Sequence, residues 1–305
     1  MRRFLRIPAI FHRAFLNALD HDFFNLAQAA AYSAIVALFP MLIVAAGVIA
    51  FLPHTAPIRA QLREFFTPVL PPDVTPLLQS YFDPSPQTST TTNKHPFILA
   101  VLVSVFEASS VIATYMEGIR RSHGLPPSCW TFMSRRGRAF ALVPLSLVPL
   151  AIASSLVVFG HFITIWLAGN VMPSVRTPVF LFALLTRWTV ALTGSVGLIG
   201  LLYHMGTPIR QPWKRVLPGA IIATIMWFLA TLGFGWYVTR FANYSRVYGS
   251  LGAAIALLFW LYIISLCVLY GAELNVQFHH HFREDFSPSD PPHSPAAPPH
   301  NPPPS

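Results

Sequence analysis

Charged residues are scarce in this chain of 305 residues. Asp, Glu, Lys and Arg together make up 10% of it, while 54% of the residues are hydrophobic and the mean hydropathy is +0.54. A soluble domain carries about 25% charged residues, and a soluble chain of this length needs them to cover its surface. The composition therefore argues against a soluble enzyme and indicates a polytopic membrane protein.

The chain also lacks the motifs of several catalytic and metal-binding classes. It has no Walker A loop, no GxGxxG after a strand, no HExxH and no GxSxG. Its two cysteines, Cys129 and Cys267, form no CxxC pair. We therefore expect no enzyme activity, no catalytic residue, no cofactor and no metal site. The histidine tract at 279–281 leaves metal binding open as an alternative.

Six apolar runs are long enough to cross a hydrocarbon core about 30 Å thick. A backbone inside the bilayer must satisfy its own hydrogen bonds, so each run is predicted to be a helix. The predicted spans are 29–52, 97–117, 140–168, 179–204, 217–239 and 249–272. The predicted fold class is therefore an all-α polytopic membrane bundle with six transmembrane helices.

Lys and Arg are distributed unevenly between the two ends of these spans. Thirteen of the 20 fall in the N-terminal segment, the 118–139 loop, the 205–216 loop and the C-terminal tail. Because basic loops remain in the cytoplasm, we predict that both termini are cytoplasmic. The same rule accounts for the net charge of +9 without a nucleic-acid partner.

Three regions outside the spans have distinct compositions. Residues 1–28 place apolar side chains at helical spacing between arginines, which predicts an amphipathic interfacial segment, with a disordered basic arm as the alternative. Residues 53–96 hold two short amphipathic patterns and are predicted to form an external hairpin. Residues 279–305 are rich in His and Pro and are predicted to be a disordered cytoplasmic tail, which leaves 29–278 as the membrane domain.

Polar side chains inside the spans are the candidates for a substrate site, because ionisable groups in hydrocarbon are costly and tend to face a cavity or a partner. Five of them recur on one face of the second span: Glu107, Ser110, Thr114, Glu117 and Arg121. A rise of about 1.5 Å per residue places Glu107, Arg187 and His161 at comparable depths in three spans. We predict a Glu107–Arg187 pair with His161 nearby, lining a cavity. The alternatives are a pair that only fixes helix register and an Arg187 that snorkels to the interface.

Three prolines fall inside the predicted spans. Pro40 lies in the middle of the first span, and Pro144 and Pro149 lie in the third. A proline in a helix interior removes one hydrogen bond and clashes with the preceding turn, so we predict a kink or break at each. Broken spans often line transport pathways, and a bundle that simply tolerates bends is the alternative.

Two segments resemble the YihY/BrkB family of bacterial inner-membrane proteins. They are AAAYSAIVALFPMLIVAAGVIAFL from Ala29 and YGSLGAAIALLFWLYIISLCVLYGAELN from Tyr248 to Asn275. The residues that match the family pattern are Tyr32, Phe39, Pro40, Tyr248, Gly249, Trp260, Gly271, Glu273 and Asn275. The resemblance implies a six-helix protein of the bacterial inner membrane. It supplies no catalytic residue, although members have been labelled ribonuclease BN or virulence factor.

These observations together predict a protein that transports or handles a lipid-like or amphipathic substrate in the bacterial envelope. Its expected partners are the lipid bilayer and a lipid or amphipathic small molecule. The alternative is a non-transporting scaffold for envelope assembly or for serum and stress resistance. A membrane-bound ribonuclease is the least favoured hypothesis, because the sequence has no carboxylate cluster or metal-ligand set that would support metal-assisted phosphodiester cleavage.

Overall fold

The protein is an all-α membrane helical bundle. The computed structural model describes residues 7–51, 94–149, 173–207, 209, 211–241 and 250–284, and no strand occurs among them. Five helices in this part of the chain are long and apolar enough to cross a membrane. They are α2 (Phe23–Phe51), α5 (Lys94–Ser122), α7 (Pro173–Met205), α8 (Trp213–Phe241) and α10 (Ser250–Glu284). The remaining elements are α1 (Ile7–Asp20), the short 3-10 helix η2 (Pro127–Cys129) and a helix over 132–149.

Two helices extend into segments that the sequence analysis placed outside the membrane domain. α2 begins at Phe23, inside the predicted interfacial segment. α10 continues to Glu284, so the prediction of a disordered tail is wrong for its first residues. Phe278, the residue just before the predicted tail, packs against the cluster formed by Ile10, Ala14 and Leu274, so the helix is still supported where the tail was predicted to begin. Residues 53–93 of the predicted hairpin lie outside the described residues. The third predicted span is described only to residue 149.

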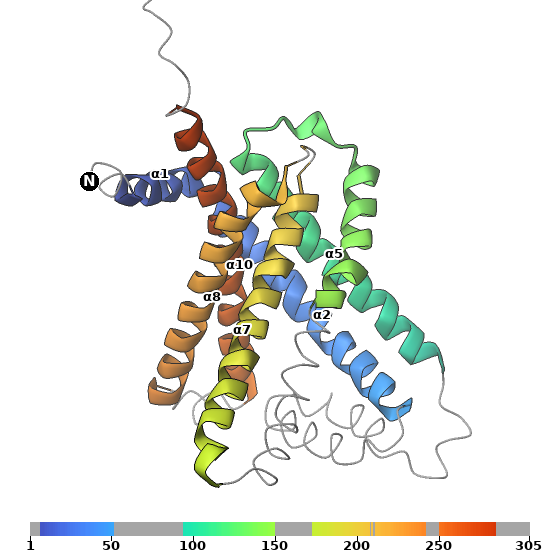
Figure 1. Cartoon of the computed structure of the whole chain (residues 1–305). Helices are drawn as coiled ribbons and strands as arrows, with labels where there is room; N and C mark the ends of the chain where they lie inside the picture. The colour runs from blue at the N-terminus through green and yellow to red at the C-terminus, as the bar shows by residue number, and fades with distance from the viewer. Residues whose placement is uncertain are drawn as a thin grey trace, which may run out of the picture.

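α10 lies at the centre of the bundle (Figure 1). It packs against α8, α2, α1 and α5, while α2 also packs along α5 and α7 along α8. Every residue of α10 from Gly271 to Val276 is buried. On α2, the small side chains of Ala27, Ala30 and Ala31 are buried, which permits close approach of the neighbouring helices.

The outer surfaces of the long helices are apolar. Large exposed side chains occur on each of them, including Tyr32 (67% exposed), Leu102 (62%), Leu185 (66%), Leu229 (60%) and Phe259 (50%). In water such a surface would be an aggregation hazard, whereas lipid tails solvate it. The exposed apolar belt therefore agrees with the lengths of the helices in indicating a bundle that is surrounded by lipid.

The prolines do not interrupt the helices that contain them. α2 is continuous through Pro40, and the 132–149 helix is continuous through Pro144 and includes Pro149 as its last described residue. The prediction of a break is therefore wrong at Pro40 and Pro144, while a kink there remains a prediction. Helices in a bilayer tolerate proline because neighbouring groups can satisfy the freed carbonyl.

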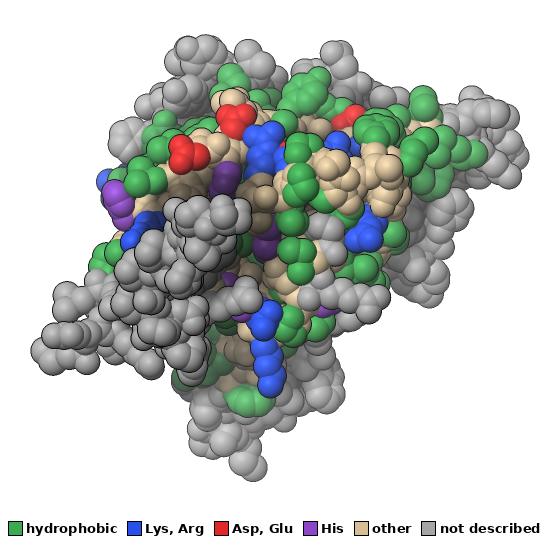
Figure 2. All heavy atoms as spheres, turned by 90° about the horizontal axis from the view of Figure 1, so that it is seen from above, with side chains coloured by type: hydrophobic (Ala, Val, Ile, Leu, Met, Phe, Trp, Pro, Cys, Tyr) green, Lys and Arg blue, Asp and Glu red, His purple; other side chains and the backbone are tan. Residues whose placement is uncertain are grey.

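One end of the bundle gathers the termini of the described chain and most of its charged side chains. α1 crosses this end, and the C-terminal parts of α7 and α10 and the 123–131 connection lie there too (Figure 1). We call it the basic end. Figure 2 views it from above and shows Lys and Arg side chains near acidic and histidine side chains, with apolar side chains around them.

Candidate functional site

The turn between α1 and α2 directs α1 across the basic end. Asp22 has a φ of 62°, a left-handed conformation that Asp adopts more readily than most residues. The amide of His21 donates to the carbonyl of Asn17 at 2.8 Å, which closes α1, and the Asp22 carboxylate accepts from the Asn25 amide at 2.6 Å, inside α2. This sharp turn places the side chain of His21 against α10.

Glu273 on α10 has a fully buried side chain that is held by polar partners from three positions. Its Oε1 accepts from the side-chain amides of Asn17 and Gln277, each at 3.0 Å. The Nδ1 of His21 lies 3.0 Å from its Oε2, and the His21 side chain is 26% exposed. An ionisable group buried in a transmembrane helix is a functional candidate by default. Here it also fastens α1 to the central helix.

Glu117 on α5 is the second carboxylate of the basic end, and arginines surround it. Arg120 donates to it at 2.7 and 3.0 Å, Arg121 at 3.1 Å and Arg135 at 3.2 Å. These are charge-assisted hydrogen bonds, and the Arg120 contact is bidentate. Glu117 therefore ties the end of α5 to the beginning of the 132–149 helix.

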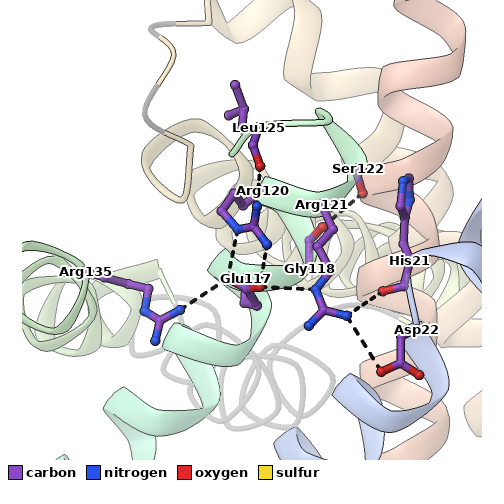
Figure 3. A network of polar contacts seen from close by, with 9 residues as sticks. All are labelled: His21, Asp22, Glu117, Gly118, Arg120, Arg121, Ser122, Leu125 and Arg135. Carbon is purple, nitrogen blue, oxygen red and sulfur yellow. Dashed lines mark hydrogen bonds and ion pairs between the residues drawn. The ribbon is translucent and has the colours of Figure 1, made fainter. Parts of the chain in front are cut away.

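Arg121 connects the two carboxylate clusters. Its guanidinium donates to the backbone carbonyl of His21 at 3.0 Å and lies 3.7 Å from the Asp22 carboxylate (Figure 3). Since His21 contacts Glu273 and Arg121 contacts Glu117, one polar network joins α10, the α1–α2 turn, α5 and the 132–149 helix.

The end of α5 is fixed by a glycine cap. The amide of Gly124 bonds to the carbonyl of Arg121 at 2.9 Å, and the amide of Leu125 bonds to the carbonyl of Arg120 at 3.2 Å. Gly124 has a φ of 61° and is therefore the residue in the left-handed conformation that this Schellman motif needs. Arg120 also donates to the carbonyl of Leu125, so the same side chain holds Glu117 and the loop that follows.

Arg136 differs from these arginines because its partners are neutral. Its guanidinium donates to the hydroxyl of Ser110 at 3.1 Å and to the carbonyl of Phe106 at 3.3 Å. It lies 4.2 Å from the ring centre of Phe106 and 5.2 Å from that of Phe140, which are cation–π distances. No ion pair within the described ranges includes Arg136. Its partners among the described residues are all neutral, and it lies where α5 meets the 132–149 helix.

Two glycines bring α8 and α10 into contact beside Glu273. A Cβ on Gly271 would lie 2.5 Å from the Cβ of Ala223 and 2.7 Å from the hydroxyl of Tyr203. A Cβ on Gly219 would lie 2.6 Å from the carbonyl oxygen of Gly271 and would also overlap Asn275. The Asn275 side chain accepts from the amide of Gly219 at 3.2 Å. α8 and α10 therefore lie so close together that any residue other than glycine at either position would force the neighbouring atoms to move.

The predicted polar stripe on α5 faces partners that the sequence analysis did not assign. Ser110 bonds to Arg136 and Glu117 bonds to Arg135, while the Thr114 hydroxyl donates to the carbonyl of Ser110 at 2.9 Å. Glu107 is partly buried, and no hydrogen bond or ion pair to it occurs among the residues that the structure describes.

The proposed partners of Glu107 are not covered by the structure. The side chain of Arg187 and all of His161 lie outside the described residues, so the predicted Glu107–Arg187 pair remains a prediction.

The residues that match the family pattern have different surroundings. Gly271, Glu273 and Asn275 are buried in the contacts described above, and the Trp260 indole lies 3.4 Å from the hydroxyl of Thr231. Tyr32 is exposed, and Phe39 is partly buried. Tyr248 and Gly249 lie outside the described residues. The buried part of the pattern therefore serves helix packing around Glu273.

Several residues of the network were not predicted from the sequence, notably Asn17, His21, Asp22 and Arg135. The signal that could have revealed them is the polar side of the N-terminal segment, where Asn17 and His21 lie one turn apart. Within the described ranges, no three His, Cys, Asp or Glu side chains lie together in a way that could hold a metal ion.

Comparison with known proteins identifies the family. The family model described as Virulence factor BrkB matches residues 14–296. The chain belongs to the BrkB family. Relatives named as UPF0761 membrane proteins match most of it. One from Alteromonas mediterranea is 26% identical over 80% of this chain and 79% of its own length. The protein YihY of Escherichia fergusonii is 26% identical over 73% of this chain and 72% of its own length.

One further relative of this BrkB-family chain has a name that refers to an activity. YfkH of Bacillus subtilis, named as ribonuclease-like, is 36% identical over 30% of this chain and 34% of its own length. No solved structure matches this chain. The comparisons therefore support the BrkB family and a membrane location, and the function has to be argued from the site.

Proposed function

We propose that this protein handles an anionic, lipid-like substrate in the bacterial inner membrane and moves it within or across the bilayer. The observation that carries this proposal is Arg136, whose partners are a serine hydroxyl, a backbone carbonyl and two aromatic rings. A cation without a carboxylate partner beside lipid is costly unless an anion binds to it. Guanidinium groups suit phosphate and carboxylate headgroups, because their donors match the geometry of these anions.

The surroundings of Arg136 suit the apolar part of such a substrate. Phe106 is 53% exposed and Phe140 is 37% exposed, so the rings that flank the guanidinium are open to lipid. Leu102, one turn before Phe106 on α5, is 62% exposed. A headgroup at Arg136 would leave its acyl chain along this apolar surface. A polar contact beside exposed apolar side chains suits an amphipathic ligand.

The orientation of the protein is part of the same proposal. We propose that the basic end faces the cytoplasm, with both termini on that side, because basic connections are retained there. The described ends of the chain and the basic connections lie at this one end (Figure 1), which supports the proposal. Arg136 would then serve the cytoplasmic leaflet.

The predicted cavity residues give the proposal a second component. Glu107 follows Phe106 directly, so its backbone adjoins the carbonyl that accepts from Arg136. We keep the pairing of Glu107 with Arg187 near His161 as the proposed continuation of a polar path through the bundle. A pathway of this kind predicts that Glu107→Gln reduces substrate movement while the protein still folds.

The test measures lipid binding and lipid movement by the purified protein. Native mass spectrometry would compare bound phosphatidylglycerol with bound phosphatidylcholine for the wild type, Arg136→Gln and Arg138→Gln. Arg138 is the matched control, because it is an exposed arginine of the same helix that lies 5.2 Å from the Trp130 ring. Loss of one charge-assisted contact should reduce phosphatidylglycerol occupancy about tenfold in Arg136→Gln, with little change in the control.

Movement is measured separately in vesicles that contain a fluorescent phosphatidylglycerol analogue. The wild type should accelerate exchange between leaflets, and both Arg136→Gln and Glu107→Gln should slow it. Equal lipid binding by Arg136→Gln and the wild type would contradict the proposal. RNA cleavage by the purified protein would instead favour the activity that the name of YfkH suggests.

A non-transporting scaffold is the second candidate, and the packing around Glu273 favours it. The buried residues of the family pattern, Gly271, Glu273 and Asn275, hold helices together. A scaffold predicts tolerance of Arg136→Gln and Glu107→Gln and sensitivity at Gly271. The two candidates are therefore separated by the variants that already test lipid binding and movement.

A further inference from the structure

We infer that α1 is an in-plane membrane anchor, which inserts one apolar face into the headgroup–acyl boundary of the bilayer at the basic end. The face consists of Phe15, Leu16 and Leu19, whose side chains are 50%, 45% and 48% exposed. The partner is the bilayer surface itself. This inference does not depend on the proposed lipid site at Arg136.

α1 has three distinct faces rather than the two of a simple amphipathic helix. Ile10, Ala14 and Ala18, spaced four residues apart, are buried in clusters with α10 and α2. Arg13 and Asp20 are exposed on another side. Phe15, Leu16 and Leu19 form a third face that is exposed and mainly apolar, and the exposed His12 also lies on it, two turns before Leu19. An apolar helix face is stable only where apolar material covers it, so this face needs a partner.

Four successive residues, from Asn17 to Asp20, show where the third face points. The Asn17 amide bonds to Glu273, while Ala18 packs in a cluster with Leu269, which lies one turn further from the basic end along α10. Each step along a helix turns the side chain by about 100°. The rotation from Asn17 to Ala18 is thus toward the bilayer. Leu19 continues it, and Asp20 returns to the water side.

The apolar surface of α8 continues beneath α1. Ile222 and Met226 pack against the cluster that Ile10 and Ala14 of α1 form with Leu274, while their neighbours Ile221 and Ile225 are 43% and 51% exposed. The lipid-facing surface of the bundle therefore runs up to the helix. The sequence that precedes α1 contains Arg2, Arg3 and Arg6, and arginines next to an interfacial helix favour a surface of anionic lipids. Position, apolarity and charge all favour the bilayer rather than a second copy of the chain.

The test uses spin labels on single cysteines in the full chain. Cys129 is replaced by serine, and the buried Cys267 is kept. Labels are placed at Phe15→Cys and Leu19→Cys on the third face. The matched controls are Arg13→Cys and Asp20→Cys on the same helix. Collision rates with oxygen and with a water-soluble nickel chelate are then measured in vesicles of phosphatidylethanolamine and phosphatidylglycerol.

We expect the labels at 15 and 19 to collide with oxygen freely and with nickel about tenfold less often than the controls, because an apolar face in the headgroup–acyl boundary excludes a hydrated reagent. Equal nickel collision rates on both faces would overturn the inference, since α1 would then lie in water. Low rates with both reagents, together with dipolar broadening between labels, would also overturn it and identify a second copy as the occupant. The Cys129→Ser background without an added cysteine reports any labelling of Cys267.

Discussion

Glu273 and Glu117 lie in one polar network at the same end of the bundle, but their surroundings differ. The Glu273 side chain is fully buried, and its partners are two amides and an imidazole. The Glu117 side chain is 19% exposed, and its partners are three arginines. Both carboxylates are therefore satisfied, one by neutral amide donors beside a single histidine and the other by permanent cations.

The difference follows from the cost of removing charge from water. A buried ion pair must lose the hydration of both groups, and this penalty can exceed the attraction between them. Asn and Gln satisfy the oxygens of a carboxyl group without a second permanent charge. Water reaches Glu117 and its arginines, so they keep part of their hydration. The burial of each carboxylate thus accounts for the kind of donor that surrounds it. Three substitutions test this comparison between Glu273 and Glu117.

The largest expected effect is that of Glu273→Ala. It leaves the side-chain amides of Asn17 and Gln277 without their acceptor and removes the side-chain contact of Asn17 on α1 with Glu273 on α10. An unsatisfied buried donor costs about 1–3 kcal/mol, so we expect a loss of about 3 kcal/mol in the free energy of unfolding. Thermal unfolding in detergent would measure it. Glu273→Gln is the control, since it keeps an acceptor for Asn17 and should lose less; equal losses would show that the amide contacts contribute nothing.

Gly271→Ala should have the next largest effect, because it acts on the packing that holds Glu273 in place. The added methyl would meet Ala223 and Tyr203, and overpacking of this kind costs about 2 kcal/mol. Gly233→Ala on α8 is the matched control, because nothing lies within 4 Å of its added methyl. It should be neutral or slightly stabilising by the same unfolding measurement. A Gly271→Ala variant as stable as the control would disprove the close contact.

Glu117→Gln should have the smallest effect of the three. Its arginines can return to water, so we expect a loss of about 1 kcal/mol. The loss should shrink as salt is raised, because exposed charges are screened. The effect of Glu273→Ala should not change with salt. Unfolding measured at low and high salt for both variants checks this difference, and a Glu273→Ala effect that falls equally with salt would remove the distinction between the two sites.

The sequence predicted the helices better than it predicted which polar side chains bond to one another. The apolar runs at 29–52 and 217–239 correspond to α2 and α8, because a run of that length in a bilayer can only be a helix. The stripe on α5 was also recognised, since helical spacing alone places Ser110 and Glu117 on one face. Their partners, Arg136 and Arg135, were not recognised. Which arginine reaches which residue depends on how two helices cross.

For Glu273, too, the sequence predicted the helix but not the contacts of the side chain. Its place in the terminal motif was visible, but nothing in the sequence connects it with Asn17 and His21, more than 250 positions away. That contact exists because Asp22 turns the chain in the left-handed conformation and lays α1 beside α10. Local rules describe the turn and the helix separately, and only their combination places His21 at Glu273.

By itself the sequence determined that this protein is a helical membrane bundle with one basic end, since apolar length and the distribution of arginine act residue by residue along the chain. The tertiary structure decided which carboxylate is buried among amides, which is surrounded by arginines, and that the partners of Arg136 among the described residues are neutral. These outcomes depend on depth and on helix crossing, and both are set by packing between segments that are distant in the chain.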